Sequence, residues 1–170
     1  IYMKIPVFSS TIRRKEMDAV LTCMVAERVG PGEMNQRFSQ TVKESLSFEG
    51  AGVFRSASIA LDYACNALNL TAGSGIIISA LAPAWHYHAV SRLGYNPIVT
   101  DVDAETAVVT ADSLKNAVDQ GGRLILLHET LGFVPDMPSI LALNIPVIED
   151  ISQSVGTFVN EKPVGTFGIF

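Results

Sequence analysis

The sequence predicts an α/β fold in which a mostly parallel sheet is flanked by helices. Strand-like and helix-like stretches alternate along the chain, which is typical of β-α-β units. The expected strands are continuous apolar runs without polar alternation, and such runs favour strands covered on both faces. Of the 170 residues, 48% are hydrophobic and 17% are charged, against about 25% charged in typical soluble domains. Much of the chain must therefore be buried or meet a partner.

Each expected element follows from a local pattern. Helices are predicted over 12–28 and 33–47 because their apolar residues have one-face spacing, and Gly30-Pro31-Gly32 separates them. The later elements are a short strand over 52–55, a helix that includes 59–68, a strand over 76–81, a helix over 86–93 ending at Gly94, a strand over 98–102, a helix over 112–120, strands over 123–127 and 146–149, and a helix start at Asp136 and Met137. No repeat or linker interrupts this order, so residues 1–170 are expected to form a single α/β domain.

Charge, hydropathy and cysteine usage argue against several classes of protein. The net charge is −5, the pI is about 5.1, and no basic run exceeds Arg13-Arg14-Lys15, which argues against nucleic-acid binding. No stretch reaches the ~18 unbroken apolar residues of a membrane helix, and no signal peptide is visible. Cys23 and Cys65 lack disulfide or metal spacing, so both are expected to be small core residues. The expected location is the cytoplasm.

Ligands of open parallel sheets bind beyond the carboxyl ends of the strands, so the residues after each strand are the candidates. Arg55-Ser56-Ala57-Ser58 joins a strand to a helix, where small residues and free N–H groups can bind a phosphate. A plain serine N-cap is the alternative explanation. The segment is neither a GxGxxG nor a Walker motif, so dinucleotide and ATP binding have no support.

Flat side chains follow the next strand. The segment Pro83 to His88 contains Trp85, His86 and Tyr87, which could stack on a planar heterocycle. Core or interface packing is the alternative. His86 and His88 do not share a helix face, which argues against a metal pair.

Acidic residues follow the last two strands. Asp150 ends a buried apolar run, and a carboxylate there needs a cation such as a protonated ring nitrogen. Capping of the next turn is the alternative. His128 and Glu129 could form an acid/base dyad, but adjacent side chains point apart, and this favours a structural histidine.

Together these segments resemble the pyridoxal 5'-phosphate (PLP)-dependent nucleotide-sugar aminotransferases of the DegT/DnrJ/StrS group, which have the fold-type-I aminotransferase architecture. The matching segments, each with the family pattern, are Ile5-Pro6-Val7 (the family's opening), Gly30-Pro31-Gly32 with Phe38 (G-P…F-E), Arg55 to Leu61 (N-S-G-T-x-A-L), Pro83 to Tyr87 (P-S-x-T-F/W), Gly94 to Asp103 (G-A-x-P-V-F-V-D-V-D), His128 to Met137 (H-x-x-G-x-x-x-D-M) and Glu149 to Gly156 (E-D-A-A-Q-A-x-G). The resemblance implies that the chain is the N-terminal half of the large domain.

The resemblance also implies a role for individual residues. Ala57 and Ser58 would bind the PLP phosphate, and Tyr87 would stack on the ring. Asp150 would pair with the pyridinium nitrogen and keep it protonated, so that the ring can act as an electron sink. Gln153 would reach the phenolic oxygen. A homodimer, a nucleotide-linked keto sugar as substrate and an amino donor are further implications.

The chain departs from the family pattern at its end. The family's catalytic lysine follows a G-S-x-G-D…S-F segment, but here Gly165 to Phe170 has Ile169 in place of Asp and no lysine after it. Lys162 matches a surface turn, so no catalytic residue is assigned, and Ala57 stands where the family has Gly. Either the chain is part of a longer aminotransferase, or it is an inactive relative that self-associates or binds phosphate. A Rossmann-type dinucleotide enzyme would need a glycine fingerprint that is missing.

Overall fold

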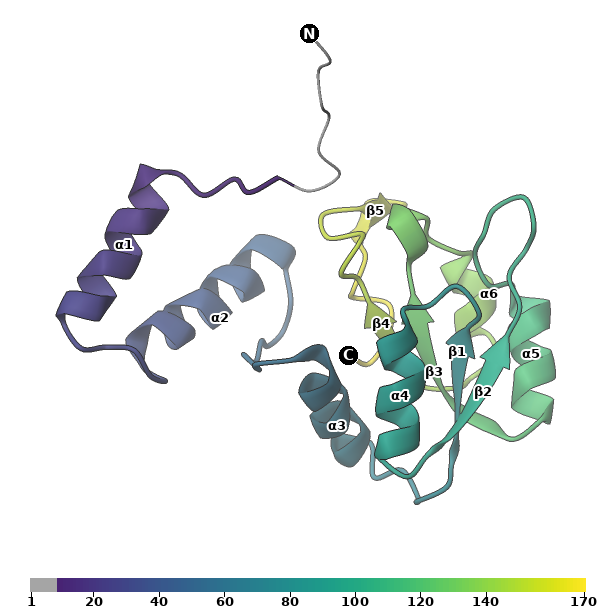
Figure 1. The fold of residues 1–170 in the computed structure, drawn as a ribbon. Coiled ribbons are helices and arrows are strands. Elements are labelled where there is room, and N and C mark those ends of the chain that lie inside the picture. Colours follow the sequence, from purple (N-terminus) through teal and green to yellow (C-terminus); the bar gives the residue numbers. More distant parts are fainter. Residues whose placement is uncertain (1–8) are drawn as a thin grey trace, which may run out of the picture.

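The computed structural model describes residues 9–170, so the resemblance at Ile5-Pro6-Val7 lies outside the described residues. Four parallel strands form the sheet in the order β2-β1-β3-β4 (Figure 1). The strands are β1 (Gly75–Ser79), β2 (Asn96–Thr100), β3 (Gly122–His128) and β4 (Val147–Asp150). The helices are α1 (Arg14–Val25), α2 (Glu33–Leu46), α3 (Ala57–Ala67), α4 (Ala84–Arg92), α5 (Ala111–Asp119) and α6 (Met137–Leu141). The predicted α/β class is confirmed.

Helices cover both faces of the sheet. On one face α3 and α4 contribute Leu61, Cys65 and Val90 to a core with alternate side chains of β1 and β3. On the other face α5 and α6 contribute Leu114 and Met137 to a second core with the intervening strand residues. Every residue of β1 is buried, as the absence of polar alternation predicts.

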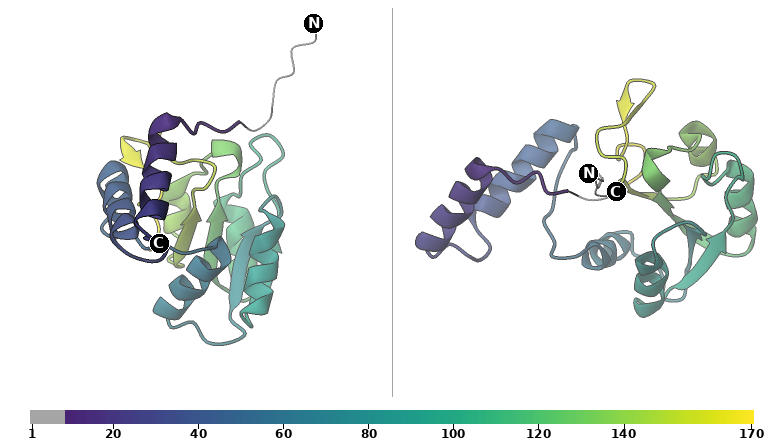
Figure 2. Two further views of the ribbon diagram at one scale, coloured as in Figure 1. Left: turned by 60° about the vertical axis from the view of Figure 1, so that its left-hand side comes forward. Right: turned by 45° about the horizontal axis from the view of Figure 1, so that its top comes forward.

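The first two helices behave differently from the rest. Neither α1 nor α2 contains a buried residue, and both stand apart from the sheet in Figure 1 and in the right-hand view of Figure 2. Their exposed apolar side chains, here called the N-terminal apolar face, are Met17, Val20, Leu21, Met24, Val25, Met34 and Phe38. The periodicity therefore predicts both helices correctly. The apolar side chains that it predicts to be buried are, however, not covered by any other described part of the chain.

Three sequence predictions need correction or addition. Residues 52–55 do not form a strand, because this exposed segment has no strand beside it among the described residues. Cys23 lies on α1 outside both cores and is only partly buried, whereas Cys65 is a core residue as expected. A 3₁₀ turn at Thr130–Gly132 and a hairpin of β5 (Phe158–Val159) and β6 (Lys162–Pro163) were not predicted.

The end of the described chain lies along β4. The Ile169 N–H donates to the carbonyl of Val147, and the Glu149 N–H donates to the carbonyl of Phe170. Within residues 9–170, none of the helices has the length and apolar character that a membrane crossing requires.

Candidate functional site

The carboxyl ends of β3 and β4 bring two polar side chains together. The strands pair in a register that sets His128 opposite Asp150. Because β1 is the other neighbour of β3, the helix that follows β1 begins at the same edge of the sheet. That helix is α4, and His86 lies in its first turn.

The side chains of these three elements meet at one carboxylate oxygen. Asp150 Oδ2 lies 2.8 Å from His86 Nε2 and 2.9 Å from His128 Nδ1. The side chains are 0% exposed for His86, 1% for His128 and 11% for Asp150. Asp150 Oδ1 accepts a hydrogen bond from the Ser152 backbone N–H at 3.1 Å. The carboxylate is thus held by hydrogen bonds on both of its oxygens.

These hydrogen bonds set the charge of Asp150. Burial raises the pKa of the carboxyl, but the hydrogen bonds from His86 and Ser152 outweigh it, so the pKa lies well below its ordinary value. Two imidazoles and a carboxylate are also groups that bind divalent metals, and their ligand atoms lie within 4.8 Å of one another. In the structure the three side chains contact one another directly through these hydrogen bonds.

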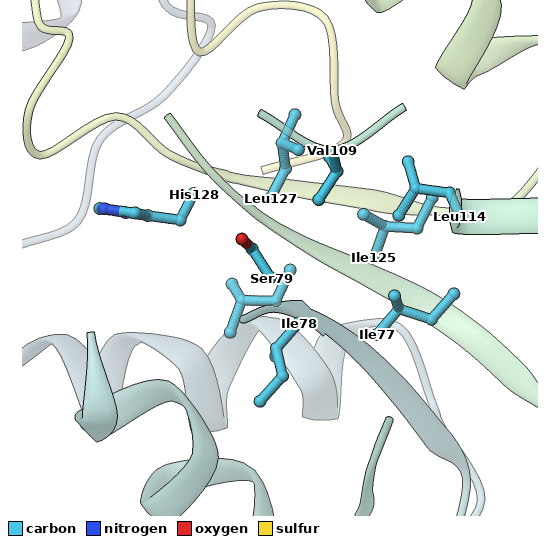
Figure 3. Close-up of a pocket in the computed structure, with 9 residues that line it drawn as sticks. Ile77, Ile78, Ser79, Val109, Leu114, Ile125, Leu127 and His128 are labelled. Atoms are coloured by element: carbon cyan, nitrogen blue, oxygen red, sulfur yellow. The ribbon is translucent and has the colours of Figure 1, made fainter. Parts of the chain in front are cut away.

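Figure 3 shows the apolar interior beside His128. Ile77, Leu114, Ile125 and other apolar side chains line a space too narrow for a water molecule, and the His128 ring points away from Leu114. The interior between the sheet and α5 therefore has no room for a ligand, and the polar groups lie at the strand ends.

Glu149 organises the end of the described chain. Its buried carboxylate accepts hydrogen bonds from three backbone N–H groups, those of Gly165 at 2.9 Å, Phe167 at 2.7 Å and Gly168. Gly165 has φ +82°, and a Cβ there would come within 3.0 Å of both Ile151 and Phe48. Glu149 therefore fixes the segment that follows β6 against β4.

Glu129 is the opposite case, a buried carboxyl without hydrogen bonds. Its residue is 0% exposed, and neither carboxyl oxygen has a hydrogen-bond partner within the described residues; the Ser154 hydroxyl also lacks one. Burial raises the pKa of Glu129; the neighbouring Ser154 hydroxyl lowers it in part, and the charges of Glu149 and Asp150 raise it further. Glu129 and His128 form no hydrogen bond with each other, since His128 pairs with Asp150, so the acid/base dyad is not formed.

Gln153 lies on an exposed turn after β4. Its side-chain Oε1 accepts a hydrogen bond from the Leu131 backbone N–H at 2.6 Å. Leu131 is in the left-handed region at φ +53°, inside the 3₁₀ turn. This contact uses the carbonyl end of the amide and leaves the NH₂ end for another partner.

The start of α3 is open to solvent. Ser56 is the N-cap of the helix, and its hydroxyl accepts a hydrogen bond from the Ile59 N–H. Ser58 is half-buried, with its hydroxyl 3.3 Å from that of Ser56, and Ala57 is exposed. The serine N-cap is thus present, and Ala57 and Ser58 lie beside it in the first turn.

The aromatic residues of α4 separate into two environments. Trp85 packs against the α3/α4 core, with its ring 4.2 Å from that of His86. Tyr87 is 47% exposed and His88 is also exposed. The packing alternative therefore holds for Trp85, while the Tyr87 ring is accessible.

The His86–Asp150–His128 contact was not predicted from the sequence, although a signal for it existed. His128 and Asp150 end buried strands, and His86 lies in the first turn of the helix after another one, so a shared sheet edge could have been inferred from the parallel order. What the sequence did not give was the neighbour relation of β1, β3 and β4.

Comparison with known proteins decides the family. The model of the DegT/DnrJ/EryC1/StrS aminotransferase family matches residues 10–170. The chain belongs to this family. Similar proteins include the GDP-perosamine synthases of Vibrio cholerae (25% identity) and Escherichia coli O157:H7 (27%), each compared over 169 residues that make up 96% of this chain and 46% of the relative.

Solved structures of similar proteins give the same picture. An aminotransferase from Psychrobacter cryohalolentis has a TM-score of 0.86 and 27% identity over 93% of this chain and 42% of its own. E. coli GDP-4-keto-6-deoxy-D-mannose-3-dehydratase with bound hydrated PLP has a TM-score of 0.88 and 26% identity over 97% and 45%. The family fold is therefore present, and the chain spans less than half the length of these relatives.

Proposed function

We propose that this DegT/DnrJ/EryC1/StrS family chain forms the cofactor-binding part of a PLP-dependent enzyme that acts on a nucleotide-linked keto sugar, with transamination as the reaction. The observation that carries the proposal is the buried, ionised Asp150 carboxylate at the end of β4. A carboxylate in that state is a partner for a cationic ring nitrogen. The relatives named as GDP-sugar enzymes support the substrate class.

The residues present fit the groups of PLP. Asp150 would bind the ring nitrogen, and the free NH₂ of Gln153 would donate to the phenolic oxygen. Ala57 and Ser58 would bind the phosphate at the start of α3, where the helix N-terminus favours an anion. Tyr87 would cover the ring with its exposed side chain. When bound, PLP supplies an electron sink for the reacting carbon.

The described residues offer no amine placed to hold the cofactor covalently. Lys162, the only lysine after Lys115, directs its ammonium to the Phe167 ring, 4.3 Å from the centroid. We propose that residues 1–170 are part of the large domain and that the lysine comes from elsewhere in the protein. The alternative, favoured by this placement of Lys162, is a relative that keeps the scaffold without catalysis.

An absorbance spectrum of the protein that carries this chain, mixed with PLP, separates these possibilities. A lysine-bound PLP band that disappears with an amino donor such as glutamate supports transamination. Bound PLP without that band supports the scaffold alternative. Absence of PLP binding, with Asp150→Ala and wild type giving the same spectrum as free PLP, contradicts the proposal.

A homodimer is the proposed assembly, because the N-terminal apolar face of α1 and α2 is uncovered in the single chain. Sedimentation should give a mass above that of one chain, and Leu21→Ser with Val25→Ser should weaken association. A monomeric wild type would contradict this assembly. The proposed location is the cytoplasm, because both cysteines are free thiols, as is usual in a reducing compartment.

A further inference from the structure

Two histidines from different elements share a single oxygen of Asp150. His86 reaches Oδ2 from α4 and His128 reaches it from β3. The two imidazole rings are nearly perpendicular, at 85°, with their centroids 5.6 Å apart. They therefore approach the oxygen from different directions and leave the carboxylate little rotational freedom.

The hydrogen bonds fix the tautomer of each ring. An ionised carboxylate only accepts hydrogen bonds, so His86 must carry its proton on Nε2 and His128 must carry one on Nδ1. His86 Nδ1 is buried and has no hydrogen-bond partner in the described part of the chain. A proton on His86 Nδ1 would have no acceptor there, which agrees with the tautomer that carries the proton on Nε2.

The two oxygens of Asp150 differ in what they can still accept. A carboxylate oxygen has two lone pairs, and both on Oδ2 are used by the histidines. Oδ1 accepts the Ser152 backbone N–H at 3.1 Å, and the Ser152 hydroxyl also lies near the carboxylate. Because that hydroxyl can rotate to another partner, Oδ1 is the oxygen that can accept a hydrogen bond from a ligand.

His86 is also where the chain departs from the family pattern. In the segment P-S-x-T-F/W, which Pro83 to Tyr87 matches, the Thr position is occupied by His86. A threonine side chain is too short to reproduce a contact made by the far nitrogen of an imidazole. The second histidine contact is thus a property of this chain and does not follow from the pattern.

We propose that His86 is a positioning residue: together with His128 it fixes Oδ2 of Asp150, so that Oδ1 is the oxygen presented to the ring nitrogen of PLP. The role toward PLP rests on the proposed function, whereas the hold on the carboxylate does not. His86 itself need not touch the cofactor.

The tautomer can be measured on the wild-type protein without any variant. Long-range ¹H–¹⁵N NMR spectra should show a proton on Nε2 of His86 and a proton on Nδ1 of His128. A His86 ring protonated only on Nδ1 would overturn the proposal, because Nε2 could not then donate to Asp150.

Variants test the hold on the carboxylate. His86→Gln keeps an N–H donor near the position of Nε2, His86→Leu removes the donor, and His88→Leu is the matched control on the exposed side of the same helix. The ¹³C shift of the Asp150 carboxyl, followed against pH, should titrate at higher pH in His86→Leu and stay near wild type in the other two. Circular dichroism would establish that each variant is folded. If His86→Leu does not fold, the tautomers of the wild type and the Asp150 titration in His86→Gln still test whether His86 holds the carboxylate.

PLP binding tests the consequence for the cofactor. The dissociation constant, measured by PLP fluorescence, should rise about tenfold in His86→Leu, the effect of losing one hydrogen bond to a charged group. It should change less than about twofold in His86→Gln and His88→Leu, since both keep the donor. Wild-type affinity in folded His86→Leu overturns the positioning role. If wild type binds no PLP, the proposed function fails, and the Asp150 titration still decides whether His86 holds the carboxylate.

Discussion

The two ends of the proposed cofactor site differ in how much of the site the chain itself completes. At the carboxyl ends of β3 and β4, Asp150 is buried and bound by two histidines, and Glu149 is bound by three backbone N–H groups. At the start of α3, Ala57 is exposed and only the Ser56 cap is engaged. The strand ends, α4 and the 165–168 segment thus complete the ring-nitrogen end within the described chain, whereas the phosphate end offers only a helix terminus.

The largest effect on stability is expected at Glu149, because its removal leaves more hydrogen-bond donors without a partner than any other substitution considered below. Glu149→Leu leaves three backbone donors without an acceptor, which should lower the free energy of unfolding by about 3 kcal/mol or more. Urea unfolding measures the loss. Glu105→Leu, at an exposed glutamate, is the control and should change stability by less than about 0.5 kcal/mol. Similar small losses in both variants would show that the 165–168 segment does not depend on Glu149.

Asp150 gives the next largest effect, and its sign depends on pH. The folded pKa lies below the ordinary value, so its contribution is complete above the unfolded pKa of about 3.9 and declines as pH falls further. Asp150→Asn should therefore cost about 1.5–3 kcal/mol at pH 7, and the difference from wild type should narrow below about pH 4. Thermal unfolding at pH 7, 5 and 3 measures it. A constant difference at all three pH values would contradict an ionised Asp150.

Glu129 should show the opposite pH dependence at the same edge of the sheet. Burial raises its folded pKa, so the contribution of Glu129 to stability is most favourable below the unfolded pKa of about 4.3 and declines as pH rises above it. Glu129→Gln removes the buried charge and should raise stability on the order of 1 kcal/mol at pH 8. At pH 4 the gain should be much smaller. A gain that is equal at both pH values would mean that the charge of Glu129 is not the cause.

The same contrast separates what the sequence could and could not predict. Apolar runs such as 76–81 fix strands, and the parallel order follows from their lack of alternation, so the fold class was accessible. The placement of Asp150 at a strand end was also accessible. Its two histidine partners were not, because 22 and 64 residues separate them from Asp150 along the chain. Only the order of β1, β3 and β4 brings them together.

Glu149 and Glu129 illustrate the limit more sharply. Both follow or end apolar runs of similar composition, yet one accepts three backbone hydrogen bonds and the other accepts none within the described residues. The difference comes from where the 165–168 segment returns to the sheet, which no local pattern encodes. The strand prediction over 52–55 was wrong for the same reason: a strand needs a neighbouring strand, and the composition of a segment does not identify one.

The smallest effect on stability, and the sharpest test of the phosphate end, is expected at Ser58. Its hydroxyl lies near that of Ser56 on a solvent-facing helix start, so Ser58→Ala should change the free energy of unfolding by less than about 0.5 kcal/mol. If Ser58 binds the phosphate, the variant should bind PLP more weakly than wild type while binding pyridoxal, which has no phosphate, equally well. Ser91→Ala, at an exposed serine of α4, should alter neither affinity. An equal loss for both ligands would place the effect of Ser58 on the ring and not on the phosphate, because only a phosphate contact distinguishes the two molecules.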